Sequence, residues 1–466
     1  MNSTRIEKDF LGELEIPADA YWGIHTLRAV RNFPLSGRTV NAGLIRAYAL
    51  VKKACCLANA ETGHLDAERA RAVEQACDEV AGGGLAGQFP VDALQGGAGT
   101  STNMNLNEVL ANRAIEILEG RRGDYALVHP LEHVNLHQST NDTYPTAVKV
   151  AGIFGLRSLS RAAADLQGAF QEKEKEFGAI VKVGRTELQD AVPMTLGAEF
   201  AAFAEAISRD RWRTFKGEER LRVVNLGGTA VGTGLAAPRD YIFLVIEKLR
   251  EATGQGLSRG ENLAGETAFA DPLVEVSGVL KAHAANLVKI AGDLRLLNLL
   301  GEIRLPDLQA GSSIMPGKVN PVLPEAVIQA GLRVFANDAI VSDALSRGTG
   351  QISEFLPLAA DAFLGSLDLL ARVDALLAEH VLGIAADEEA CRRTFDRSPM
   401  LVTALVPHLG YVRATGLIRE YRDLETQGLL AGRTMRTFLE EKLGKERIDR
   451  ILSPWSLTAL GYRKEK

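Results

Sequence analysis

The chain has 466 residues, of which 46 % are apolar, and this is enough for a large buried core and for two or three domains. Its 53 basic and 59 acidic residues are mixed along the chain and give a formal charge of −6, so no basic field favours nucleic acid or an anionic membrane as a partner. The charged first residues and the lack of a run of eighteen apolar residues predict a soluble, cytoplasmic protein.

Long helices are predicted after an irregular start. Residues 1–40 contain scattered prolines and glycines and no helical period. Further on, apolar residues recur at three- and four-residue spacing, which predicts helices at about 44–63, 146–177, 195–224, 274–297, 325–345 and 356–386. Helices of this length with wide apolar faces are typical of an all-α fold built on a central long-helix bundle, which also buries surface between subunits.

The segment from about residue 391 is predicted to form a small separate domain, because its elements are shorter and its end is more charged. The four cysteines fall in helix-like contexts and are expected to be buried thiols.

Four polar patches interrupt the apolar pattern. They read "GGAGTSTNMNLNE" at 96–108, "HQSTNDTYPT" at 137–146, "GRTELQD" at 184–190 and "GSSIMPGKVNPVLPE" at 311–325. Each patch offers hydroxyl, amide or backbone N–H donors, which suit a small dianionic substrate. Taken singly, each patch is better explained by turns and helix caps than by a binding site. The prolines of the last patch, at 316, 321 and 324, predict a loop there.

Several other site types have less support. The stretches "GGAGTS" and "GGTAVGTG" lack the P-loop lysine and the dinucleotide-binding spacing, so no nucleotide cofactor is expected. His129, His133 and His137 recur at four-residue intervals, but Pro130 limits a helix there and no carboxylate or cysteine completes a zinc shell. We therefore predict neither a metal nor a cofactor.

In this order the patches resemble the aspartase/class II fumarase superfamily, whose signature Gly-Ser-Ser-x-Met-Pro-x-Lys-x-Asn-Pro is similar to residues 311–321. The resemblance extends to 16–29, 87–113 and 410–421, and residues 138–146 and 188–197 are more similar to the aspartases than to the fumarases. It implies an all-α homotetramer in which three chains contribute to each active site. It also implies three domains, which we place at 1–140 (N-terminal domain), 141–390 (central helix-bundle domain) and 391–466 (small C-terminal domain).

The resemblance also implies an activity. The expected reaction eliminates ammonia from L-aspartate to give fumarate, reversibly, through removal of the C3 proton and a doubly charged aci-carboxylate intermediate. The substrate is then a small dicarboxylate, with no cofactor. A lyase for another aspartate-like C4 substrate, a fumarate hydratase and a catalytically silent, crystallin-like relative stay open as alternatives.

Roles follow from the same resemblance. Ser312 is the expected base, on a lid that closes over the substrate, while Lys318 and Asn320 hold substrate carboxylates and Thr186 lies on the leaving-group side. Donors for the developing negative charge are expected from Thr100, Ser101, Ser139, Thr140 and Asn141.

The chain departs from the family pattern at several places around this site. Glu187 stands where fumarases have histidine and many aspartases have glutamine or histidine, and the resemblance places it near Glu325, so that two carboxylates crowd one place. The alternative is an ion pair of Glu187 with Arg185. A Ser-Gly-Pro-Arg run is missing from 293–313, "ISEFLP" at 352–357 shortens another loop, and "HPLE" at 129–132 makes an accessory anion site doubtful.

Overall fold

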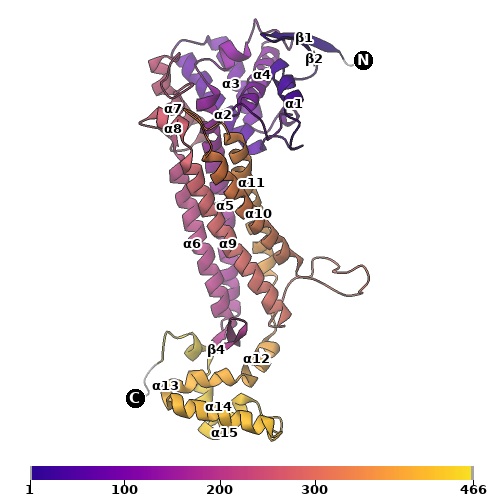
Figure 1. Ribbon diagram of the computed structural model, residues 1–466, viewed down its shortest axis with the longest axis vertical. Coiled ribbons are helices and arrows are strands. Elements are labelled where there is room, and N and C mark those ends of the chain that lie inside the picture. The colour runs from indigo at the N-terminus through magenta and orange to yellow at the C-terminus, as the bar shows by residue number, and fades with distance from the viewer. Residues whose placement is uncertain (1–2, 463–466) are drawn as a thin grey trace. The chain divides into compact units, whose positions relative to one another are not determined.

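A computed structural model describes residues 3–462 of the chain, and most of them are helical (Figure 1). The helices are α1 Ile24–Asn32, α2 Ala42–Glu61, α3 Ala67–Ala81, α4 Thr100–Ile117, α5 Thr140–Glu176, α6 Leu196–Leu221, α7 Arg239–Thr253, α8 Leu263–Ala268, α9 Asp271–Leu299, α10 Val322–Leu345, α11 Leu356–Leu382, α12 Glu388–Arg397, α13 Val406–Leu409, α14 Tyr411–Thr426, α15 Met435–Leu443, α16 Lys445–Ile451 and α17 Pro454–Thr458. A π-helical turn spans Pro130–Val134, and short 3₁₀ segments span Ala86–Gln88 and Pro399–Leu405.

The strands form only two-stranded ladders within the described residues. They are β1 Thr4–Asp9, β2 Gly12–Pro17, β3 Val181–Thr186, β4 Gln189–Thr195, β5 Val223–Val224, β6 Ser258–Arg259, β7 Ile303–Arg304 and β8 Ala385–Ala386. The pairs β1–β2, β3–β4 and β7–β8 are antiparallel, and β5–β6 is parallel. The predicted all-α class is therefore confirmed. No helix in residues 3–462 combines the length and the apolar character that a membrane crossing needs.

The chain separates into two compact units, each assembled from three stretches. Unit 1 comprises Met1–Ser160, Trp212–Ala284 and Leu332–Ala371, and unit 2 comprises Arg161–Arg211, Ala285–Gly331 and Arg372–Lys466. The divisions fall inside the long helices α5, α6, α9, α10 and α11. The three-domain division at 140 and 390 stays a prediction, and its outermost residues, 1–2 and 463–466, lie outside the described part of the chain.

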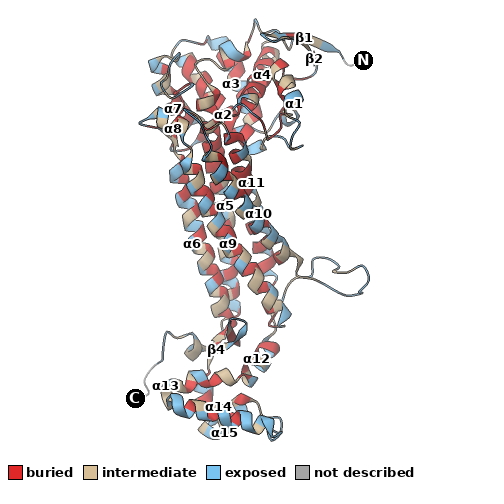
Figure 2. Cartoon of the chain, in the orientation of Figure 1, coloured by how far each residue is buried: buried red, intermediate tan, exposed pale blue. Residues whose placement is uncertain are grey.

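Unit 1 is held together by capped, closely packed helices. The side chain of Asn41 caps α2 by accepting the N–H groups of Gly43 and Leu44, at 2.8 and 3.2 Å. Between α5 and α11 the contact is so close that a Cβ atom on Gly152 would lie 2.9 Å from the ring of Phe363. Helix α4 is buried along almost its whole length, polar residues included (Figure 2).

Unit 2 has its own apolar core, formed by the β3–β4 hairpin with the C-terminal helices. Val181 and Val183 of β3 belong to one cluster with Phe395, Phe438 and Ile448. Beside it, the buried carboxylate of Glu302 pairs with both Lys182 and Arg185. The hairpin is thus fixed by packing and by charge.

Candidate active site

The first two polar patches meet in unit 1, where helices α4 and α5 begin. Gly97 and Gly99 turn the chain into α4 with φ values of 87° and 94°, and a Cβ atom on Gly99 would lie 2.4 Å from the ring of Tyr144. Thr100 begins α4 and donates its hydroxyl to the carbonyl of Gly97 at 2.7 Å. The N–H groups at a helix start favour anions, so this end of unit 1 suits a carboxylate ligand.

Thr140 and Asn141 form the start of α5 beside it. The amide of Asn103, in α4, donates to the hydroxyl oxygen of Thr140 at 3.1 Å, which joins the two helix starts. Ser139 precedes the helix, and its hydroxyl accepts the N–H of Asn141 at 3.2 Å. The structure therefore brings Thr100, Ser101, Ser139, Thr140 and Asn141 to one region of unit 1, and both local capping and substrate binding are compatible with that arrangement.

The glycine-rich loop at 225–234 supports this region. The buried carboxylate of Asp142 accepts the N–H groups of Gly227 and Thr229 at 3.1 and 2.9 Å. Asn225 donates to the carbonyl of Asn141 at 2.9 Å. Burial raises the pKa of Asp142 to about 6, while the backbone donors oppose that rise. The "GGTAVGTG" stretch thus serves as a clamp on the start of α5.

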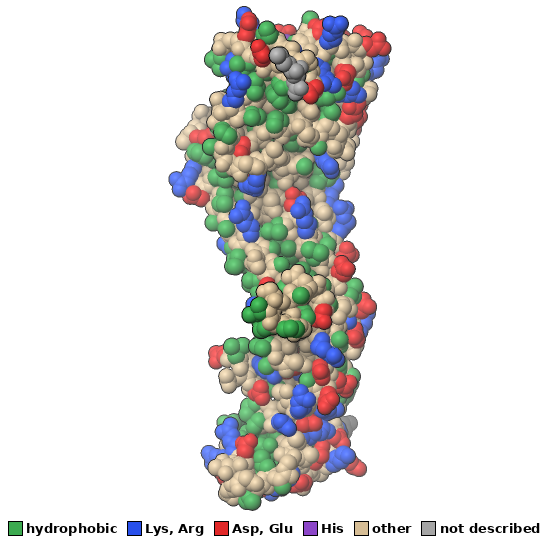
Figure 3. All heavy atoms as spheres, turned by 90° about the vertical axis from the view of Figure 1, so that its right-hand side faces the viewer, with side chains coloured by type: hydrophobic (Ala, Val, Ile, Leu, Met, Phe, Trp, Pro, Cys, Tyr) green, Lys and Arg blue, Asp and Glu red, His purple; other side chains and the backbone are tan. Residues whose placement is uncertain are grey.

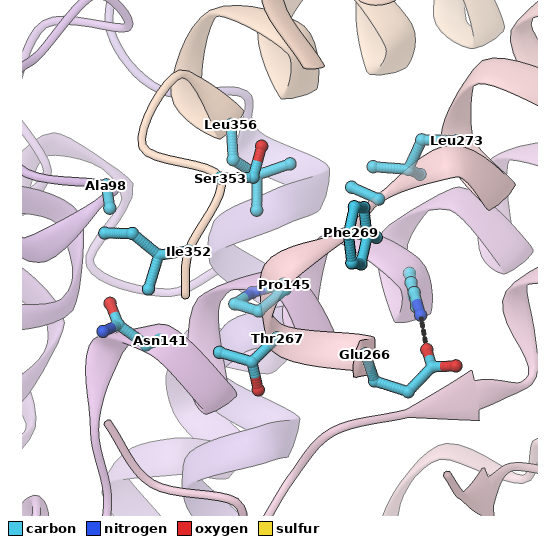
Figure 4. Close-up of a pocket in the computed structure, with 12 residues that line it drawn as sticks. Ala98, Asn141, Pro145, Glu266, Thr267, Phe269, Leu273, Ile352, Ser353 and Leu356 are labelled. Carbon is cyan, nitrogen blue, oxygen red and sulfur yellow. Dashed lines mark hydrogen bonds and ion pairs between the residues drawn. The ribbon is translucent and has the colours of Figure 1, made fainter. Parts of the chain in front are cut away.

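A small pocket of about 20 Å³ opens next to Asn141, with room for one water-sized molecule (Figure 4). On its polar side Lys149 contacts Glu266, with 2.9 Å between the ammonium and the carboxylate. Ile352, Ser353 and Leu356 line it from the segment that the sequence marks as shortened, and the hydroxyl of Ser353 is buried without a hydrogen-bond partner. A departure from the family pattern therefore lies directly beside a predicted substrate-binding residue.

The fourth patch lies in unit 2 and forms the loop between α9 and α10 (Figure 1). Its two ends are tied together, because Gly311 donates its N–H to the carbonyl of Lys318 at 2.7 Å and Asn320 donates its side-chain amide to the carbonyl of Gly311 at 2.9 Å. Inside the closed segment, the hydroxyl oxygen of Ser312 accepts the N–H groups of Ile314 and Met315 at 3.1 and 2.9 Å. Two backbone donors on one hydroxyl oxygen favour its anionic form.

One expectation for this patch was wrong. Helix α10 begins at Val322, so Val322 to Glu325 are helical rather than part of the loop. Pro324 lies in the first turn, where a missing N–H leaves no helical hydrogen bond unmade. Glu325 follows it and faces Arg295, at 3.7 Å between carboxylate and guanidinium.

Thr186 and Glu187 lie at the tip of the β3–β4 hairpin in unit 2. Glu187 and Leu188 form the two-residue turn, with φ values of 51° and 61° that few side chains other than glycine and asparagine adopt readily. Arg185 pairs with Glu302 at 2.7 Å and lies 3.8 Å from Asp190. The alternative that Arg185 takes up Glu187 is therefore not found, and the exposed Glu187 carboxylate stays available to a ligand.

The three spaced histidines serve local structure. The ring Nδ1 of His129 accepts the N–H groups of Leu131 and Glu132, and the ring Nδ1 of His133 accepts the N–H of His129 at 2.8 Å. His137 contacts the side chain of Asn59 at 2.6 Å. Across residues 3–462 no group of three His, Cys, Asp or Glu side chains is placed to hold a metal.

Comparison with known proteins decides the family. A lyase family model matches residues 12–336, and aspartate ammonia-lyases from a Bacillus species and from Pseudomonas aeruginosa are 42 % and 46 % identical over 99 % and 90 % of both chains. This chain belongs to the aspartase/class II fumarase superfamily of lyases. Among solved lyases, the fumarate lyase:delta crystallin of Brucella melitensis bound to cobalt has 45 % identity and a TM-score of 0.92, covering 98 % of this chain and 100 % of that one. A class II fumarase from Schistosoma mansoni has 30 % identity and a TM-score of 0.89, with 97 % and 98 % coverage.

In this lyase the predicted site residues fall into two sets. Unit 1 carries Thr100, Ser101, Ser139, Thr140 and Asn141, and unit 2 carries Thr186, Glu187, Ser312, Lys318, Asn320 and Glu325. Their catalytic and binding roles stay predictions, as does crowding between Glu187 and Glu325. Sequence reasoning missed the roles of the buried groups behind them, among them Lys52, Asn103, Asn135 and Asp142, because burial of a polar side chain depends on partners that are distant in sequence.

Glu187 offers a test of the leaving-group side of the lyase site. Glu187→Gln removes the negative charge and keeps the side-chain shape, so we expect the KM for L-aspartate to rise about fivefold through loss of attraction to the substrate ammonium. Steady-state assays over a range of pH measure this. As the matched control, Asp190→Asn removes a charge from the same hairpin and should leave KM within about twofold. Equal KM and an equal pH profile for Glu187→Gln and the parent would remove Glu187 from the site.

Proposed function

We propose that this lyase eliminates ammonia from L-aspartate to give fumarate. The observation that carries the proposal is full-length similarity to aspartate ammonia-lyases, and it is supported by the hydroxyl of Ser312, which receives two backbone N–H groups on a loop that also bears Lys318 and Asn320. No metal or cofactor is included in the proposal.

In the proposed mechanism Ser312 removes the proton from C3 of the substrate. The N–H groups of Ile314 and Met315 stabilise the alkoxide that this step requires. Lys318 and Asn320 hold one carboxylate. The negative charge that develops on the other carboxylate is stabilised by the donors at the starts of α4 and α5, since helix N-termini favour anions.

A homotetramer is part of the proposal, with unit 1 and unit 2 residues of different chains completing each site. Large apolar side chains are exposed on the long helices, with Trp212, Phe215, Leu332 and Leu376 each more than half accessible in the single chain. Figure 3 shows apolar side chains at the surface, interspersed with charged ones. Burying such side chains between subunits is favourable. We also propose a cytoplasmic location, which suits the four buried, free cysteines.

A second candidate is a lyase for another C4 amine. It is favoured by the pocket beside Asn141, which is lined in part by Ile352, Ser353 and Leu356 of the shortened segment 352–357. A lyase with a different pocket wall next to a substrate-binding residue can accept a different substituent on the leaving amine.

The deciding experiment supplies the purified protein with L-aspartate and, separately, with L-malate, and follows fumarate by its ultraviolet absorbance. We expect fumarate from L-aspartate alone. Fumarate from L-malate alone would replace the proposal with a hydratase, and no fumarate from either would favour the second candidate.

A further inference from the structure

Lys52 is a charged side chain in the apolar interior of unit 1. It lies in α2 and has 0 % of its surface exposed. Its ammonium donates to the side-chain oxygens of Asn135 and Gln138, at 3.0 and 2.8 Å, and both of these partners are neutral amides. Burying a charge without an ion pair is costly, so its presence calls for a specific role.

Lys52 fixes the orientation of the Asn135 amide. A lysine ammonium can only donate, so the atom of Asn135 that faces it must be the carbonyl oxygen. That same oxygen also accepts the side-chain N–H groups of Asn103 and Asn107, each at 3.1 Å. The nitrogen of the Asn135 amide is directed to the carbonyl of Gln138 at 3.2 Å. A reversed amide would lose all three donors at once.

The orientation passes from Asn135 to Asn103 and then to Thr140. Because Asn103 donates one amide hydrogen to Asn135, its nitrogen is the atom that also reaches the hydroxyl oxygen of Thr140, at 3.1 Å. The hydroxyl oxygen of Thr140 therefore accepts a hydrogen bond from the protein, through Asn103. Its own hydrogen finds no acceptor among the described residues and is free for a ligand at the start of α5.

We propose that Lys52 is a positioning residue, which acts through Asn135 and Asn103 to hold the Thr140 hydroxyl as a donor toward a carboxylate of the substrate. The inference rests on the proposed function, since that function gives the site its dicarboxylate. The inference deepens the proposed function, because it adds a buried cation that supports the predicted substrate-binding residues. Burial lowers the pKa of Lys52 to about 8, opposed by the nearby Cys55, Asp142 and Cys77, so the ammonium form prevails at neutral pH.

A double-mutant cycle between Lys52 and Thr140 tests this relay. Lys52→Met removes the charge, and Thr140→Val removes the hydroxyl while keeping the side-chain shape. Each change alone should raise the KM for L-aspartate about tenfold, which is the loss of affinity expected when one hydrogen bond to a charged group is removed. The kcat should change far less. Together they should raise KM no further than either alone, because Lys52 acts only through Thr140. Effects that multiply would overturn the relay.

The neighbouring residue provides the matched control. Lys53 lies next to Lys52 in α2 but pairs with Glu74 and Asp78, at 3.1 and 2.8 Å, and makes no contact with the relay. Lys53→Met should leave KM unchanged. If Lys52→Met does not fold, Asn103→Leu replaces it in the cycle. Asn103→Leu removes the connection between Asn135 and Thr140, and Lys52 keeps both of its acceptors. A multiplied effect in that cycle would equally overturn the inference.

Calorimetric binding of fumarate separates this inference from the proposed function. The same cycle is measured with the Kd for fumarate, which needs no turnover. A parent protein that binds fumarate but does not deaminate L-aspartate overturns the proposed function, while the Kd cycle still decides the relay. A parent protein that binds no fumarate overturns both.

Discussion

Replacing Ser312 by alanine is expected to lower kcat for L-aspartate by about 10³-fold, because the group that removes the C3 proton is lost. The KM should change little, since Lys318 and Asn320 stay on the loop and its ends stay tied through the Gly311–Lys318 and Asn320–Gly311 hydrogen bonds. Steady-state kinetics of the purified variant, followed through fumarate formation, measure the effect.

The adjacent serine gives a control that differs by one position. Ser313 is exposed, and its hydroxyl makes no hydrogen bond that the structure records among its described residues, whereas Ser312 receives the N–H groups of Ile314 and Met315. Ser313→Ala should keep kcat within about threefold of the parent, as expected for a surface change. Turnover that survives in Ser312→Ala would assign the base to another residue.

The second large effect concerns stability. Glu302→Gln should lower the thermal midpoint by about 10 °C, because loss of a buried charge that pairs two cations costs about 3–5 kcal/mol. Glu302 has 0 % of its surface exposed, and its carboxylate oxygens lie 2.7 Å from the Lys182 ammonium and from the Arg185 guanidinium. When Glu302 loses its charge, Asp190, at 3.8 Å, is the carboxylate that still pairs with Arg185. Thermal scans at one fixed rate and protein concentration measure the shift.

Glu199 supplies the comparison within the same cluster. It also pairs with Lys182, but it is more exposed than Glu302, and Lys182 keeps Glu302 when Glu199 is changed. Glu199→Gln should therefore lower the midpoint by only about a third as much. Equal shifts for the two variants would mean that the buried pairs do not govern the stability of unit 2.

Because β3 leads to Thr186 and Glu187, the Glu302 variant should also raise the KM for L-aspartate.

The long helices and the polar patches could be read from local pattern. The predicted segments at 44–63, 195–224 and 274–297 correspond to α2, α6 and α9, because an apolar face repeats with the helical period wherever a helix packs on a core. The loop of the fourth patch was found through its prolines, which cannot donate a backbone hydrogen bond. Only its last turn was misassigned, since a proline is tolerated where a helix begins.

Helix α4 shows where local pattern fails. Residues 96–108 carry three asparagines that read as a polar loop, yet from Thr100 onward they form a helix in which Asn103, Asn105 and Asn107 are buried. The amide nitrogens of these side chains donate to acceptors distant in sequence: the carbonyl of Gln88 for Asn105, and the side-chain oxygen of Asn135 for Asn103 and Asn107. No periodicity within α4 reports such partners.

The sequence by itself determined the all-α class, the family and the four polar patches, because helical periodicity and motif spacing are local properties of the chain. It also predicted the residues of the proposed chemistry. Only the tertiary structure decided which donors face which acceptors. The relay from Lys52 to Thr140, the clamp of Asp142 on the glycine-rich loop and the pairing of Glu302 with Lys182 and Arg185 all join residues far apart in sequence. The free energy of a buried polar group depends on partners that folding alone brings within hydrogen-bond distance.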